Sequence, residues 1–321
     1  MTYDPKTWVD GECLLAADLN AMEAGTDRAQ GDIMKPYGPT AGLPVSDPLL
    51  EGRLYFESDL LRRVWRDNGA GWDNVTPFAG NGLLNNLTAY WKEDEPGGAN
   101  DALDAHINGL TMTQTHSPGS AAGIINTARV FAAGDYFSRL DDAWLSTGDV
   151  DFTISGWVYP TNLAAGGGQV IFSKLNIAGN QREYVLYYNN VDHVPNDRFS
   201  FAVSSNGVAL QIIDANTFGG VLNNAWYHLV GWHDAATDQI GISVNNVADT
   251  IPYALGVFDS TASAAMGVFF NGAAIWYQLI GRGDETGFWK SAPGGGGALT
   301  PADRLTLWNG GAALPYGSFT A

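Results

Sequence analysis

The feature that most constrains the fold is a series of short runs in which apolar residues alternate with polar or small ones. Phe152, Ile154 and Val158 fall on one face of such a run, because successive side chains of a strand point to opposite faces. Similar runs occupy residues 199–203 and 240–244, and clusters of Gly, Asn and Asp separate them. This pattern is typical of antiparallel strands that pack on a core. We therefore predict an all-β sandwich.

Composition agrees with a folded, turn-rich chain. The 321 residues include 40 Gly and 14 Pro, but 45% of them are hydrophobic and 11 are Trp. Frequent Gly and Pro together with many aromatic residues indicate short strands joined by tight turns. Cys13 is the only cysteine, so an intrachain disulfide is excluded.

Charge and hydropathy exclude two further classes of partner. With 16 Lys and Arg against 34 Asp and Glu, the formal net charge is −18. A nucleic-acid-binding protein needs clustered basic side chains to neutralise phosphates, and an anionic membrane surface attracts the same residues. The N-terminus lacks a basic and apolar leader, and no run of about 18 apolar residues occurs. We expect no nucleic-acid partner, no membrane insertion and no signal peptide.

Three segments follow one another along the chain. Residues 1–34 hold a short helical pattern, and residues 35–86 hold a linker rich in Pro and Gly followed by a β-hairpin. The turn residues Asp67-Asn68-Gly69 favour that hairpin. From residue 87 to residue 321 the pattern is that of a β domain. Its one helical stretch begins at Pro301, with Thr300 as the predicted N-cap.

The N-terminal helix carries the spacing of a coiled-coil seam. Leu15, Leu19 and Met22 lie alternately four and three residues apart. A helix of barely two heptads is marginal alone in water, and so is a lone hairpin. The helix therefore packs either on its own chain or on a second copy. We expect homo-oligomerisation through residues 1 to about 80.

A series of blocks resembles, in order, the laminin-G-like domains with a concanavalin A-like jelly roll. The blocks are residues 88–92, 130–139, 145–159, 172–174, 183–186, 198–201, 226–230 and 287–290. This resemblance implies a concanavalin A-like jelly-roll sandwich, preceded by the short N-terminal helix, the linker and the small β-hairpin.

Two stretches narrow the resemblance to viral proteins. Residues 145–154 and the ending around Gly287-Phe288-Trp289-Lys290 are similar to lectin-like modules of phage and marine viral structural proteins. Residues 3–12 and 16–20 resemble the attachment segment of phage tail and fibre proteins. The family tends to carry Pro-Leu-Thr where this chain has Cys13-Leu14-Leu15, which removes an expected N-cap.

The resemblance implies a non-enzymatic virion protein of tail or fibre type. Its N-terminal segment would bind other virion proteins, its copies would form a homotrimer, and its outward-facing lectin-like domain would bind host or environmental glycans on a cell surface. A purely structural tail, collar or capsid-decorating protein is the alternative. A glycan depolymerase is the third interpretation.

Catalysis on this fold would need two carboxylates about 5 Å apart. Glu93-Asp94-Glu95 is not followed by the further Glu of a catalytic strand, and Asp149 and Asp151 lie at a strand entry. We expect surface or turn roles for these carboxylates and no catalytic residues. We also expect His228 to be structural.

Aromatic side chains are the candidate glycan-binding residues. Sugar rings stack on aromatic faces, and Asp and Asn side chains bind the hydroxyls. Trp276, Tyr277, Tyr253 and Tyr188 lie beside turn signals and could serve as such platforms. Each of them could equally be a core or sheet-face residue.

The resemblance also implies one structural calcium ion. The family ligand is an Asp of the last strand, which corresponds to Asp284, assisted by backbone carbonyls of early turns. Asp104 or Asp135 would add a second carboxylate, because calcium takes six to eight oxygen ligands. Alternatively, Asp284 caps a turn or pairs with Arg282. The tripeptide Arg282-Gly283-Asp284 resembles an integrin-binding motif, which we attribute to chance.

Overall fold

The structure is a computed structural model, and it describes residues 33–37, 54–57, 64–67, 72–74 and 82–321. The chain divides into two compact units, Met1–Ala79 and Gly80–Ala321. Leu15, Leu19 and Met22 lie outside the described residues, so the N-terminal helix and its seam stay a prediction.

The first unit contains a four-stranded sheet with the strand order β1-β2-β3-β4. Its strands are β1 (Ile33–Tyr37), β2 (Leu54–Glu57), β3 (Val64–Asp67) and β4 (Trp72–Asn74). Strand β2 pairs antiparallel with β3, and β3 pairs antiparallel with β4. Strand β1 spans the predicted boundary between residues 34 and 35 and runs parallel to β2. Pro36 lies where the register of this pair shifts, between Met34 and Tyr37, and proline is tolerated at such irregularities of an edge strand.

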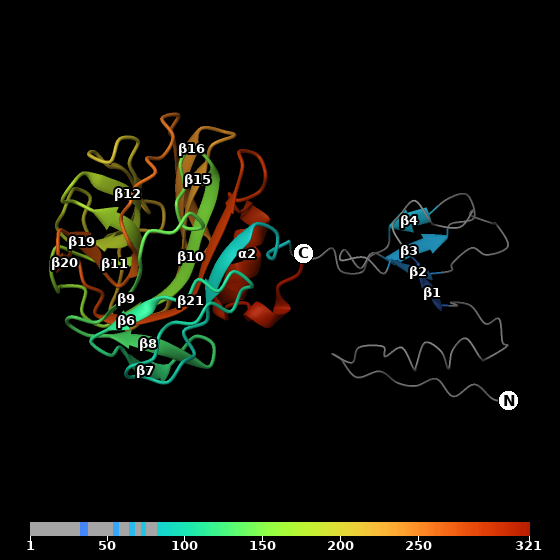
Figure 1. Cartoon of the computed structure of the whole chain (residues 1–321), viewed down its shortest axis with the longest axis horizontal. Helices are drawn as coiled ribbons and strands as arrows, with labels where there is room; N and C mark the ends of the chain where they lie inside the picture. Colours follow the sequence, from blue (N-terminus) through green and yellow to red (C-terminus); the bar gives the residue numbers. More distant parts are fainter. Residues whose placement is uncertain (1–32, 38–53, 58–63, 68–71, 75–81) are drawn as a thin grey trace. The chain divides into compact units, whose positions relative to one another are not determined.

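The second unit is a sandwich of two largely antiparallel sheets (Figure 1), as predicted. The eight-stranded sheet has the order β17 (Val247–Pro252), β16 (Gln239–Val244), β15 (Tyr227–Asp234), β10 (Asp151–Pro160), β21 (Gly281–Ser291), β8 (Thr127–Phe131) and β7 (Gly119–Ala122), with β5 (Leu87–Trp91) also paired to β21.

The nine-stranded sheet forms the other layer. Its order is β14 (Gln211–Asp214), β13 (Arg198–Val203), β12 (Gln181–Asn189), β11 (Gly168–Asn176), β18 (Ala264–Met266), β9 (Tyr136–Arg139) and β6 (Thr113–Thr115), with β19 (Phe269–Asn271) and β20 (Ala274–Trp276) attached through β11.

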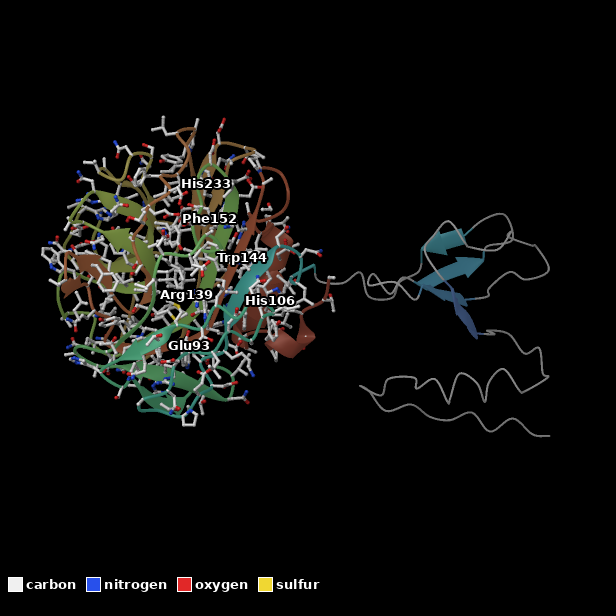
Figure 2. All side chains as sticks on the ribbon, in the orientation of Figure 1. Glu93, His106, Arg139, Trp144, Phe152 and His233 are labelled. Atoms are coloured by element: carbon white, nitrogen blue, oxygen red, sulfur yellow. The ribbon has the colours of Figure 1, made fainter. Side chains whose placement is uncertain are left out.

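The main core lies between the two sheets. Phe152, Ile154 and Val158 of β10 are all buried in it, which confirms the predicted face. The Phe152 ring (Figure 2) packs at 5.4 Å from that of Tyr184 on β12 and at 6.0 Å from that of Phe288 on β21. Burial of large side chains from both layers stabilises the sandwich by about 1.5–3 kcal/mol for each side chain.

A second core covers the outer face of the eight-stranded sheet. Helix α2 (Pro301–Trp308) packs there through Leu307 beside Trp289 of β21. Thr300 caps the helix in a capping box with Asp303, as the sequence predicts. Two short 3-10 helices follow, η3 (Asn309–Gly311) and η4 (Tyr316–Ser318).

His228 confirms its predicted structural role. It is 2% exposed on β15, and its Nε2 lies 2.9 Å from the Ser155 hydroxyl. Burial lowers the pKa of His228 to about 3, so the ring is neutral at physiological pH. Within the described part of the chain, no helix combines the length and the apolar composition needed to span a membrane.

Candidate functional site

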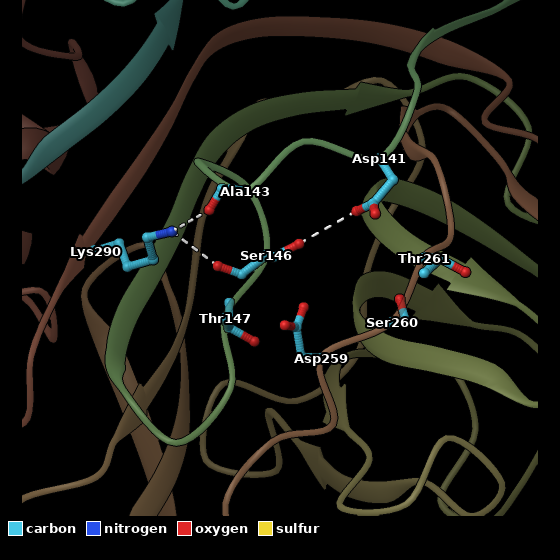
Figure 3. A pocket seen from close by; sticks show the side chains of 8 residues that line it. All are labelled: Asp141, Ala143, Ser146, Thr147, Asp259, Ser260, Thr261 and Lys290. Carbon is cyan, nitrogen blue, oxygen red and sulfur yellow. Dashed lines mark hydrogen bonds between the residues drawn. The ribbon is translucent and has the colours of Figure 1, made fainter.

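A polar pocket opens where two loops meet the end of β21 (Figure 3). Its volume is about 380 Å³. It is lined by Asp141, Ala143, Ser146, Thr147, Asp259, Ser260, Thr261 and Lys290. A second hollow of about 390 Å³ shares Asp141 with the first. The loop between β9 and β10 therefore contributes to both concave features.

Asp142 fixes the conformation of that loop. Its Oδ1 accepts the Trp144 amide at 3.0 Å, and its Oδ2 accepts Nε and Nη2 of Arg139 at 2.9 and 2.7 Å. Burial raises the pKa of Asp142, but these bonds outweigh it and leave the pKa below its usual range. A charged, multiply bonded carboxylate therefore holds the pocket wall in place.

A buried ion pair supports the pocket from inside the sandwich. Lys174 on β11 and Glu183 on β12 are both fully buried, and Nζ lies 2.8 Å from Oε2. The other carboxylate oxygen of Glu183 accepts the amide and hydroxyl of Thr147 at 2.6 and 2.8 Å. Ser260 donates its amide and its hydroxyl to Oε2. Asp141 completes the group, 2.9 Å from Lys174 Nζ. We call Lys174, Glu183, Asp141, Thr147 and Ser260 the Lys174 cluster.

Lys290 ties the same loop to β21. Its Nζ donates to the carbonyls of Ala143 and Ser146 at 2.7 and 2.8 Å, as Figure 3 shows. Burial lowers the pKa of Lys290. Asp259 faces the pocket from the opposite loop and is exposed. The pocket thus exposes the carboxylates of Asp141 and Asp259 to solvent. The charged groups buried behind its lining, Lys174 and Glu183, are paired with each other.

An exposed aromatic ring lies on the pocket loop. Trp144 follows Ala143 in the chain and is 53% exposed, and Leu140 is 82% exposed. Figure 2 marks Trp144 on the β sandwich. The exposed indole offers a flat apolar face to solvent.

The structure corrects the assignment of Tyr188 and Tyr253 as glycan platforms. They are 3% and 5% exposed and belong to the main core. Their hydroxyls are bound internally, to Asp197 Oδ1 and to the Gly256 carbonyl, each at 2.8 Å. Neither ring face is therefore open to a ligand.

Trp276 and Tyr277 lie together on the outer side of the nine-stranded sheet, away from the pocket lining. Trp276 is 44% exposed. The Tyr277 hydroxyl donates to Asp192 at 2.7 Å, and its ring packs 4.9 Å from that of Phe269. Tyr277 therefore anchors a loop, whereas Trp276 is available as a second aromatic surface.

Asp284 is fully buried on β21. It pairs with Trp157, whereas the preceding Gly283 pairs with Val158 of the main core, so Asp284 lies on the face of the sheet opposite that core. The amides of Ile124 and Ile125 donate to Oδ2 at 2.7 and 3.2 Å, while Oδ1 has no partner among the described residues. Burial, with the neighbouring charges of Glu93 and Glu285, raises the pKa of Asp284 to about 9. Because Asp284 is buried, the tripeptide it ends is not presented to a receptor.

Glu285 follows Asp284 at a β-bulge. The pairing of β21 with β10 shifts register there, and Glu285 has a φ of 51°. Burial raises the pKa of Glu285 to about 7, and the Tyr90 hydroxyl is hydrogen-bonded to its carboxyl group. Its Oε2 has no partner within the described chain.

Glu93 is buried, which corrects its predicted surface role. It is 1% exposed and accepts the Thr286 hydroxyl at 2.7 Å. Burial raises its pKa to about 8. A Cβ on Gly283 would lie only 2.9 Å from its Oε2, so the glycine makes room for this carboxyl on the core side of β21. We call Glu93, Asp284 and Glu285 the carboxyl cluster.

Asp151 is buried too, and its carboxylate accepts hydrogen bonds from the amides of Ala235 and Gly294.

Asp104 and Asp135 do not join Asp284, which corrects the predicted ligand set. Asp104 accepts the amides of Tyr90, His106 and Leu110, and Asp135 accepts that of Ala132. Both act as turn caps, with oxygens committed to backbone N–H groups. Among the described residues no group of three or more His, Cys, Asp and Glu side chains is arranged to hold a metal ion.

Sequence reasoning missed the pocket residues. Asp141, Asp259 and Lys290 are far apart in the chain and belong to no spacing motif. The one local signal is Trp144 within a polar loop after a strand, because a Trp outside the alternating pattern has no predicted core position.

The two-sheet jelly roll places the chain in the class of concanavalin A-like β sandwiches. The chain belongs to the concanavalin A-like lectin/glucanases superfamily, whose family model matches residues 131–295, just over half of the chain. A search of curated proteins finds no match.

Solved structures share the fold at low sequence identity. Domain 4 of AbnA, a GH43 extracellular arabinanase from Geobacillus stearothermophilus, in complex with arabinotriose, is 21% identical with a TM-score of 0.50. That match covers 71% of this chain and 98% of that one. The binding domain of Paraclostridial Mosquitocidal Protein 1 is 14% identical with a TM-score of 0.52. It covers 70% of this chain, which spans about half (52%) of that chain.

Proposed function

We propose that this protein is a non-enzymatic component of a tailed-phage virion, of tail or fibre type, and that its lectin-like domain binds a cell-surface or environmental glycan. The observation that carries the glycan-binding part is the polar pocket, together with the exposed Trp144 on the loop that forms one of its walls. Carboxylates bind sugar hydroxyls, and an aromatic face stacks on the sugar ring.

Two further findings support glycan binding. The superfamily is named for lectins and glucanases. The AbnA domain was solved with arabinotriose, which makes a sugar a reasonable ligand for the shared fold.

A glycan array with the full chain tests this proposal. We expect binding that Trp144→Ala weakens by tenfold or more and that Trp276→Ala leaves within twofold. Both variants remove one exposed Trp, so each controls for the other. If Trp276→Ala alone abolishes binding, the ligand surface is the outer side of the nine-stranded sheet. An array with no bound glycan favours the purely structural alternative.

Two assays test the remaining parts of the proposal. Antibodies against the chain should label assembled virions, and light scattering of the full chain should give the mass of three chains. Mutation of Leu15, Leu19 and Met22 to Asp should yield monomers. A monomeric wild-type chain at micromolar concentration would refute assembly through the N-terminal segment.

The absence of catalysis is tested with reducing-sugar assays on every polysaccharide that binds. We expect no sugar release. Release that Asp141→Asn or Asp259→Asn abolishes would instead assign a depolymerase to the pocket, because these are the carboxylates that line it.

We also propose a calcium ion at Asp284, as the fold family implies. Asp284 Oδ1 and Glu285 Oε2 are buried oxygens without a partner in the described chain, and this fits a hard cation that takes oxygen ligands. Backbone carbonyls and water would complete the coordination shell. Such an ion would neutralise two buried carboxylates and so stabilise the bulge of β21.

A further inference from the structure

We infer that the pocket of Figure 3 selects uncharged, hydroxyl-rich glycans and rejects glycans that carry carboxylate or sulfate groups, an inference that rests on the proposed glycan-binding function. The selection arises from the kind of hydrogen-bonding group that the pocket leaves free.

The hydroxyl protons of the lining residues are already committed to protein acceptors. Thr147 and Ser260 donate to Glu183, at 2.8 and 2.9 Å. Thr261 donates to Gln181 Oε1 at 3.2 Å, and Ser146 donates to Asp141 Oδ1 at 3.2 Å. Each hydroxyl has a single proton, so these groups can only accept a hydrogen bond from a ligand.

The two lysine ammonium groups near the pocket also donate their hydrogen bonds to acceptors of the protein. Lys290 uses two of its three N–H groups on the carbonyls of Ala143 and Ser146. Lys174 is fully buried beneath Asp141 and binds Glu183. An anionic ligand therefore finds at most one free N–H on Lys290.

The pocket leaves more hydrogen-bond acceptors than donors free for a ligand. Among the described residues, none donates a hydrogen bond to the carboxylate of Asp259, and donors reach only Oδ1 of Asp141. A carboxylate pairs well with sugar hydroxyls, whereas a second anion beside it is repelled. The net charge of −18 adds a long-range repulsion of polyanionic glycans.

Retention on matched polymers tests the inference. Polygalacturonate and its methyl ester share one backbone and differ in charge, as do dextran sulfate and dextran. At physiological salt we expect the full chain to retain the uncharged member of a pair at least tenfold better. Asp259→Asn should narrow that ratio, and Asp259→Lys should reverse it.

Asp238→Asn is the matched control. Asp238 is exposed, lies outside the pocket lining and has a φ of 54°, which Asn tolerates as well as Asp. It should leave the ratio unchanged. Equal or better retention of the acidic members would overturn this inference but keep glycan binding. Retention of no polymer here, together with a blank glycan array, would overturn the proposed function itself.

Discussion

The Lys174 cluster and the carboxyl cluster solve the burial of charge in opposite ways. In the Lys174 cluster, a buried ammonium pairs with Glu183, and backbone and hydroxyl donors satisfy the remaining oxygens. In the carboxyl cluster, burial raises the pKa of all three acids, and each keeps one oxygen without a partner among the described residues. The first cluster is complete in itself, whereas the second depends on protons or on a cation from solution.

Removal of the buried cation should have the largest effect. Lys174→Met leaves Glu183 charged and unpaired in the interior, and this costs about 3–5 kcal/mol of unfolding free energy. Urea unfolding at pH 7 measures the loss. The matched control is Lys92→Met, because Lys92 is 46% exposed in its side chain and lies 3.7 Å from Asp94. Such an exposed pair contributes about 0–1 kcal/mol. Equal losses in the two variants would contradict the contrast between the clusters.

The carboxyl cluster should make stability fall as pH rises. The pKa values of Glu285, Glu93 and Asp284 are raised to about 7, 8 and 9, so the folded state holds protons that the unfolded state has released. In chelator, stability is then lost as the pH rises between about 4 and 9. Thermal unfolding across this range measures the slope.

Asp284→Asn should flatten that slope and raise stability at pH 8 to 9, because it removes a carboxyl group that ionises freely only in the unfolded state. Asp104→Asn is the same substitution with the opposite expected sign, since Asp104 accepts three backbone amides. If Asp284→Asn destabilises the chain at pH 9 as much as Asp104→Asn does, Asp284 is ionised and favourably bound without a cation.

Calcium should restore the stability toward unfolding that the chain loses at high pH. An ion that binds only the native state adds RT ln(1 + [L]/Kd), about 2.7 kcal/mol at 100 Kd. At pH 8 we expect calcium to raise the Tm of the wild type and to leave that of Asp284→Asn unchanged. If chelator leaves the wild-type Tm at pH 8 as it was, protons alone neutralise the cluster.

The contrast between the clusters also marks how far the sequence predicts the structure. Alternation in residues 152–158 and the cap at Thr300 depend on neighbouring residues, so both were predictable. Glu93 lies in an acidic run and looks like a surface residue. Its burial follows from the pairing of β5 with β21, which brings together segments nearly 200 residues apart.

The candidate site was less predictable for the same reason. Tyr188 and Tyr253 adjoin turn residues in the sequence, but the facing sheet buries both rings. Asp141 and Asp259 become neighbours only when the β9–β10 loop meets the segment before β18. Local patterns predict strands and their faces, whereas the depth of a side chain depends on which distant segment covers it.

The smallest expected effect tests why Gly283 stands beside the carboxyl cluster. An added Cβ would meet Glu93 Oε2 at 2.9 Å and the Phe131 ring at 3.1 Å. Gly283→Ala should therefore destabilise the chain by about 1–3 kcal/mol, as overpacking of a filled core does. In a Glu93→Ala background the carboxylate is gone, so the same substitution should cost less.

Gly317→Ala is the control, because a Cβ there meets nothing within 4 Å and its φ is not positive. A double-mutant cycle at pH 6 separates this steric coupling from ionisation, because Glu93 and Asp284 are then largely protonated. Equal costs of Gly283→Ala with and without Glu93 would mean that Phe131 alone requires the glycine.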